Sequence, residues 1–283
     1  MNRIHLITLL AAGALLSAPP AAGAQLPAGS VTKSAGSVSA TLSWKAGERD
    51  TRRPRLLVSR AGAVVTNVSL GNACNLCQLH EDRTPAGDPA PFSILHVADL
   101  DADGEPEVLF KDHSGGAHCC LTTRFFTYRS QSNTYKRAPS LKWGNAHYEV
   151  EDLDGDGTFE LNGFDDRFAA AFVAYSGSVL PPKIVRYAGD PATGRSSLTD
   201  VTRRFPHVIR AHAARQLKRI RRAKPDPVYY MTHGVLAAYV ADQYLLNRGS
   251  VGRAEMARAR RRKLARPDFQ AWVLRFLKET GYR

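Results

Sequence analysis

The chain has 283 residues and a formal net charge of +13. The charge is uneven, because residues 201–283 carry 20 Lys and Arg against 5 Asp and Glu, whereas residues 25–200 carry 18 against 21. This length suffices for one large domain or two smaller ones, and the change in charge predicts a boundary near residue 205. Beyond the first 24 residues no apolar run is long enough to span a bilayer, so we expect no transmembrane segment.

Residues 1–24 are typical of a secretory signal peptide. A basic start at Arg3 precedes an apolar run over residues 4–16, and Ala22-Gly23-Ala24 is a small-residue cleavage site. We therefore expect an exported protein that begins at Gln25 and is secreted, periplasmic or associated with the cell wall. The alternative is an uncleaved anchor, for which the apolar run is short.

The next segments predict a leader and the first strands. Residues 25–36 are rich in Gly, Ser, Ala and Pro, which predicts a flexible leader. Alternating apolar residues predict a strand over residues 37–44. Residues 55–59 and 63–70 predict a hairpin around a turn that contains Gly62.

The chain contains four cysteines: Cys74, Cys77, Cys119 and Cys120. An even number of cysteines in an exported chain favours disulfides. A bond between the adjacent pair would be strained, so we expect two bridges between the 74–77 and 119–120 segments, in an order left open. Two alternatives are a redox centre at Cys74 and Cys77, and a zinc site that combines the cysteines with His113 or His118.

A nine-residue acidic pattern, D-L-D-x-D-G-x-x-E, occurs at residues 99–107 and again at residues 152–160. We call these segments the first loop and the second loop. Calcium takes six to eight oxygen ligands, and carboxylates at positions 1, 3 and 5 converge when a Gly at position 6 allows a sharp turn. Position 7 offers a backbone carbonyl oxygen, and a Glu at position 9 completes the set of oxygen ligands around the ion.

The pattern therefore predicts two sites for Ca²⁺. The expected ligands in the first loop are Asp99, Asp101, Asp103, Glu105 and Glu107. Those in the second loop are Asp152, Asp154, Asp156, Thr158 and Glu160. The alternative is a pair of acidic surface turns, because Asp and Gly are common turn residues. Asp112 and Asp165 also recur at one offset, but they lie outside the nine-residue loops.

The surroundings of the loops exclude an EF-hand and indicate another family. An EF-hand loop needs Glu at position 12, where this chain has Phe110 and Gly163. The flanking segments are short β-type runs. Both loops resemble the calcium loops of FG-GAP (VCBS-type) repeats, found in integrin alpha-subunit propellers and in many bacterial secreted proteins. That resemblance implies propeller-blade-like antiparallel sheets, although two repeats are too few for a closed propeller.

Further strands are predicted over residues 121–128, 134–136, 168–175 and 183–187. Together with the earlier segments they make residues 37–205 a β-rich domain. We therefore expect an α+β protein in which this β-rich part precedes a small basic helical part.

The last part, residues 206–283, predicts a small helical bundle. Apolar residues at helical spacing predict helices over residues 207–222, 232–247 and 252–264, and a fourth that begins at Asp268. Basic runs at 219–222 and 258–263 indicate attraction to anionic extracellular or cell-wall polymers; the alternative is solvated helix faces. Export and the absence of interleaved aromatic residues argue against nucleic acid as a partner.

These features predict a secreted calcium-binding module with a structural or binding role. One alternative is an extracellular hydrolase built on the β-rich part. The chain has no His-Glu-x-x-His, no Gly-x-Ser-x-Gly and no phosphate loop, so we assign no catalytic residue. The other alternative is a thiol–disulfide oxidoreductase that uses Cys74 and Cys77.

Overall fold

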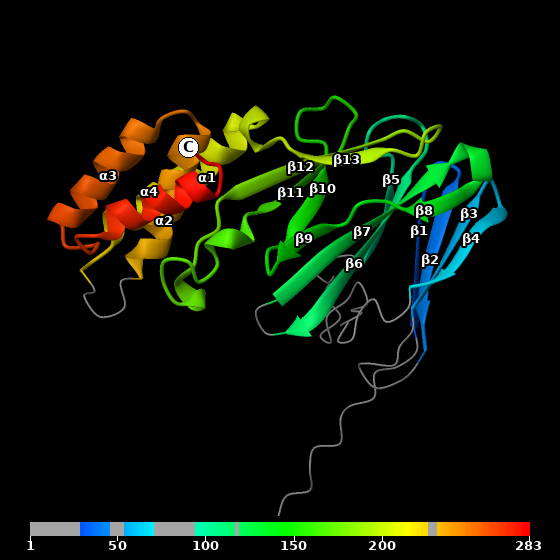
Figure 1. Cartoon of the computed structure of the whole chain (residues 1–283), viewed down its shortest axis with the longest axis horizontal. Coiled ribbons are helices and arrows are strands. Elements are labelled where there is room, and N and C mark those ends of the chain that lie inside the picture. The colour runs from blue at the N-terminus through cyan, green and yellow to red at the C-terminus, as the bar shows by residue number, and fades with distance from the viewer. Residues whose placement is uncertain (1–28, 46–53, 71–93, 117–118, 226–230) are drawn as a thin grey trace, which may run out of the picture.

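The computed structural model describes residues 29–45, 54–70, 94–116, 119–225 and 231–283, without the side chains of residues 113–119. In this part of the chain, thirteen strands form three antiparallel sheets, and four α-helices follow them (Figure 1). The predicted α+β class, with a β-rich part before a helical part, is confirmed.

Each sheet contains a meander of four consecutive strands, and the middle sheet has a fifth strand that pairs back with its third. The first sheet contains β1 (Gly29–Ala35), β2 (Val38–Trp44), β3 (Arg55–Arg60) and β4 (Ala63–Ser69). The middle sheet contains β5 (Leu95–Ala98), β6 (Glu107–Gly116), β7 (Cys119–Arg129) and β8 (Thr134–Arg137), and β9 (Leu141–Gly144) also pairs with β7. The third sheet contains β10 (Tyr148–Glu151), β11 (Glu160–Phe164), β12 (Pro182–Gly189) and β13 (Ser196–Asp200). The described part of the chain therefore has two four-stranded sheets and one five-stranded sheet, all antiparallel as predicted.

The predicted flexible leader is wrong over most of its length, because residues 29–35 form β1. This edge strand pairs with β2 over its whole length, from Gly29 opposite Trp44 to Ala35 opposite Val38. Gly29 has a specific role: a Cβ atom there would lie 2.4 Å from Cζ2 of Trp44. Ser, Thr and Gly dominate this strand, so the sequence carried little of the apolar alternation that identifies strands.

The middle sheet packs against a neighbouring sheet on each of its faces. Val108 and Phe110 on β6 join a core with the first sheet, whereas Leu109 joins a core with the third sheet. This division follows from strand geometry, since successive side chains point to opposite faces. Figure 1 shows the result as three sheets side by side, with the helices beyond the third one.

The helices are α1 (Pro206–Arg222), α2 (Thr232–Leu245), α3 (Gly249–Arg261) and α4 (Phe269–Glu279). All four occur where the sequence predicted them, within a few residues at each end. α2 is the central helix, because nearly all of its residues are buried. Within the described residues, no helix has both the length and the apolar character needed to cross a membrane.

One predicted strand, over residues 168–175, is wrong. This segment contains two short 3₁₀ turns, at Asp166–Phe168 and Tyr175–Gly177. Its aromatic residues belong to the helical core, where the rings of Phe168 and Phe172 each lie 4.9 Å from that of Phe276. The apolar run therefore reflects burial against helices, which a strand pattern does not distinguish.

Candidate metal centre

Both acidic loops connect two strands of a hairpin at the same place in successive sheets. The first loop joins β5 to β6, and the second loop joins β10 to β11. Each loop needs two left-handed residues to curl, at Ala102 and Gly104 in the first loop and at Gly155 and Gly157 in the second. Glycine adopts this conformation without the steric cost that a side chain adds, which explains its presence at position 6 of both loops.

The backbone of each loop wraps around the carboxylate at position 1. Asp99 accepts hydrogen bonds from the amides of Asp103 at 3.1 Å and Gly104 at 2.9 Å. Asp152 accepts the equivalent bonds from Asp156 at 3.2 Å and Gly157 at 3.0 Å. The repeated sequence therefore produces a repeated local structure.

The glutamate at position 9 turns back into its own loop. The amide of Leu100 donates to Glu107 Oε2 at 3.2 Å, and the amide of Leu153 donates to Glu160 Oε2 at 3.1 Å. These glutamates are the first residues of β6 and β11, and both are buried. Position 9 thus faces the inside of each loop, as a closing ligand requires.

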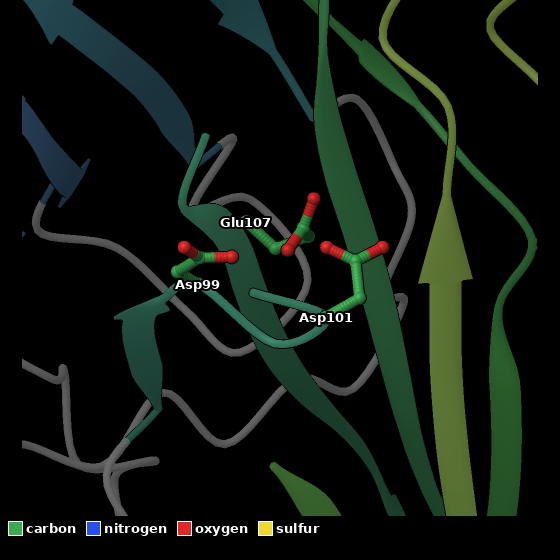
Figure 2. A group of neighbouring side chains, drawn as sticks. All are labelled: Asp99, Asp101 and Glu107. Carbon is green, nitrogen blue, oxygen red and sulfur yellow. The ribbon is translucent and has the colours of Figure 1, made fainter. Parts of the chain in front are cut away.

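In the first loop, three carboxylates meet in one place. Oxygens of Asp99, Asp101 and Glu107 all lie within 4.8 Å of one another. Figure 2 shows Glu107 between the two aspartates. Asp101 Oδ2 accepts a hydrogen bond from the amide of Gly189 at 2.5 Å, whereas its buried Oδ1 has no hydrogen-bond partner among the described residues.

The electrostatics of this cluster are unfavourable for three ionised groups. Burial, together with the charge of the nearby Asp101, raises the pKa of Glu107 to about 9. Burial likewise raises the pKa of Asp101, with Asp99 adding to the effect. A divalent cation would supply the opposite charge and accept the free lone pairs. An all-oxygen donor set of this kind suits a hard cation such as Ca²⁺.

Two of the predicted ligands of the first loop lie outside the three-carboxylate cluster. Asp103 Oδ1 accepts the amide of Glu105 at 2.8 Å. The Glu105 side chain forms an ion pair with Arg60 at the end of β3, where Nε lies 2.9 Å from Oε2. The structure thus agrees with a backbone role for position 7, since the side chain of Glu105 is engaged elsewhere.

The second loop contains a residue that the sequence analysis did not identify, Arg186 on β12. Oxygens of Asp152, Asp154 and Asp156 lie within 4.8 Å of one another. The guanidinium of Arg186 donates to Glu160 Oε1 from Nε at 2.6 Å and to Asp156 Oδ2 from Nη1 at 3.1 Å.

The remaining contacts complete the ion-pair network of the second loop. Arg186 Nη2 also contacts Glu160, and it lies 3.6 Å from Asp154 Oδ2. The hydroxyl of Thr158 donates to Asp156 at 2.5 Å. That hydrogen bond is the main reason that the pKa of Asp156 falls to about 2.

The two recurring aspartates beyond the loops have other partners. Asp112 forms an ion pair with Arg124 at 2.5 Å. Asp165 forms one with Arg167 and accepts a hydrogen bond from the hydroxyl of Tyr282 at 2.9 Å. Neither aspartate joins the carboxylate clusters, as their positions outside the nine-residue pattern predicted.

The cysteine predictions fall mainly outside the described residues. Cys74, Cys77 and His118 are not among those residues, and the side chains of His113 and Cys119 are not described. Cys120 is disulfide-bonded, and no described cysteine is free. The partner of Cys120 lies outside the described side chains, so the predicted connectivity stays a prediction.

Some arginines of the basic runs make structural contacts, either between helices or within one helix. Arg262 donates to the carbonyls of Ile220 at 3.1 Å and Ala223 at 3.0 Å, at the carboxyl end of α1. Arg258 forms an ion pair with the buried Glu255. These contacts show that part of the predicted anion-binding surface has a structural use, because cations stabilise helix carboxyl ends.

Comparison with known proteins gives distant relatives. No known protein family and no solved structure matches the chain. A protein of Synechocystis described as a probable thylakoid lumen protein is 31% identical over 163 residues, which cover 56% of this chain and 45% of that protein. An uncharacterized protein of Sinorhizobium fredii is 29% identical over 195 residues, which cover 69% of this chain and 28% of that protein. The chain thus spans less than half the length of these two relatives.

Proposed function

We propose that the protein is an extracytoplasmic calcium-binding module and that the first loop is its principal calcium site. The observation that carries this proposal is the cluster of three carboxylates, in which the buried Glu107 and the Oδ1 atom of Asp101, without a partner among the described residues, lie together with Asp99. Asp103 and the carbonyl of Glu105 are the other predicted ligands. An ion would supply positive charge where the described side chains place only carboxylates together.

The proposed role of the ion is to stabilise the stack of sheets. The first loop contacts the third sheet through the amide of Gly189, which donates to Asp101 at 2.5 Å. It contacts the second loop through the amide of Phe159, which donates to the Leu100 carbonyl at 2.8 Å. It contacts the first sheet through the ion pair between Glu105 and Arg60. A cation that fixes this loop would therefore strengthen contacts of the middle sheet with both neighbours.

Two observations support an extracytoplasmic location. Residues 1–24, which lie outside the described part, have the pattern of an export signal. One relative is described as a probable thylakoid lumen protein, which places that protein outside the cytoplasm. Extracellular calcium modules commonly bind with a Kd of about 10⁻⁴ to 10⁻³ M, a range that suits such a compartment.

Anionic extracellular or cell-wall polymers remain the proposed partner class of the helical part. The support is that residues 201–283 carry 20 Lys and Arg against 5 Asp and Glu. Exposed arginines on α3, such as Arg260 and Arg261, add to it. The hydrolase alternative has no assigned residues. The oxidoreductase alternative rests on Cys74 and Cys77, which lie outside the described part of the chain.

The test of the calcium site is a set of melting curves in chelator, calcium and magnesium. Calcium at ten times Kd stabilises a folded protein by about 1.4 kcal/mol, which raises the Tm by roughly 3–6 °C. We expect this rise with calcium and a smaller one with magnesium, which prefers tight octahedral sites.

The matched variants are Asp101→Asn and Asp154→Asn, at position 3 of the two loops. Asp101→Asn should abolish the calcium-dependent rise, whereas Asp154→Asn should keep most of it. Identical melting curves in chelator and calcium would show that the first loop is only an acidic turn.

A further inference from the structure

Arg186 lies where a cation would have to lie to neutralise the second loop. It is directly opposite Glu160 in the register of β11 and β12. Its side chain is 17% exposed, the partner glutamate is fully buried, and the contacted aspartates are 37% and 41% exposed. The guanidinium therefore links the buried glutamate at position 9 with the more exposed aspartates of the same loop.

The first loop has a different residue at the equivalent position. On β7, Phe126 pairs with Val108, so Thr127 is the next residue along and corresponds to Arg186. Thr127 is buried and carries no charge. The two loops thus share a backbone structure and differ in the strand beside them, which brings a positive charge to only one of them.

We infer that Arg186 is the built-in counter-ion of the second loop and that this loop keeps its shape without calcium, so that the protein takes up calcium at the first loop only. This inference rests on the proposed function of the first loop. It departs from the prediction of two equivalent calcium sites. It also explains why only one of the two nearly identical sequence repeats would bind the ion.

The chemistry of the guanidinium suits this role. Arginine stays charged under all physiological conditions and presents donors in a planar fork, which can serve several carboxylates at once. In the second loop these donors contact Glu160 and Asp156, with Asp154 at ion-pair distance. Calcium could enter only after this side chain had left all three partners, so its affinity for the second loop should be low.

The test is calorimetric titration of the purified protein and its variants with calcium chloride. The wild type should bind one calcium ion, and Arg186→Gln should bind two. Asp101→Asn should bind none, and the double variant Asp101→Asn/Arg186→Gln should bind one. The matched control is Arg186→Gln/Glu160→Gln, which removes both charges and should return the number of ions to one.

Melting curves in chelator show whether the variants fold. Arg186→Gln leaves a buried carboxylate without its partner, so its Tm should fall by about 10 °C and should recover when calcium is added. Arg186→Gln/Glu160→Gln should melt closer to the wild type and should not respond to calcium through the second loop. If calcium restores the Tm of Arg186→Gln, the substitution has opened a cation site. If calcium does not restore it, the substitution has only damaged the fold, and the inference fails.

The outcomes separate this inference from the proposed function. Two ions bound to the wild type, with one lost in Asp154→Asn, would overturn the inference and leave calcium binding by the first loop in place. One ion bound to the wild type and only one to Arg186→Gln would also overturn it. No binding to the wild type but one ion bound to Arg186→Gln would support the counter-ion role of Arg186 and overturn the first-loop site. No binding to either protein would overturn both.

Discussion

The first and second loops share a sequence pattern and a backbone fold, but their carboxylates are neutralised in different ways. In the second loop, Arg186 contacts the carboxylates directly. In the first loop, an ion pair with Arg60 engages Glu105 and leaves Asp99, Asp101 and Glu107 together. The difference shows that the same acidic pattern gives the same loop shape, while the neighbouring strand brings a charged partner to the carboxylates of only the second loop.

The largest expected effect that separates the loops is the response to removing the charge at position 9. Without calcium, Glu160→Gln should lower the free energy of unfolding by roughly 3 kcal/mol, because it removes the buried partner of Arg186. Glu107→Gln should change it by less than about 1 kcal/mol, since burial already favours the protonated form of Glu107. Urea denaturation of both variants in chelator measures the two values.

The comparison of the two loops would fail if both variants lost the same stability. Equal losses would mean that Glu107 has a favourable charged partner as strong as Arg186. Arg60 would then be the first residue to test, because it pairs with Glu105 in the same loop.

The next expected effect is a pH dependence of the calcium-free protein. The pKa of Glu107 is raised from 4.5 to about 9, so the folded state holds a proton that the unfolded state releases above pH 4.5. The free energy of unfolding therefore falls as the pH rises through this window, by roughly 2 kcal/mol between pH 7 and pH 9. Saturating calcium should remove this loss, because the ion favours the ionised carboxylate.

Denaturation in chelator at pH 7, 8 and 9 measures this slope, and Glu107→Gln is the control that should flatten it. A slope that is the same in the wild type and in Glu107→Gln would assign the pH dependence to another group.

Much of the candidate site could be predicted from the sequence, because the information is local. The spacing of Asp99, Gly104 and Glu107 specifies the turn, the hydrogen bonds and the inward glutamate within nine residues. Arg186 could not be found in this way. It lies 26 residues after Glu160, and it faces that glutamate only because of the register between β11 and β12.

The fold shows the same distinction between local and long-range information. The helices were predicted well, since the apolar spacing of α4, for example, is complete within eleven residues. β1 and β13 were missed, because these strands have few apolar residues and are held by pairing with β2 and β12. The apolar run that contains Phe168 and Phe172 was mispredicted as a strand. Its packing partners are in the helical core, including α4 about a hundred residues later, so nothing close in the sequence identifies them.

The most direct test of the difference between the loops is anomalous diffraction from crystals soaked with a lanthanide ion that replaces calcium. We expect one strong peak, next to Asp99, Asp101 and Glu107, and none in the second loop, where Arg186 should keep its contacts with Glu160 and Asp156. Peaks of equal height in both loops, with Arg186 turned away, would contradict the account. So would the absence of a peak in the first loop.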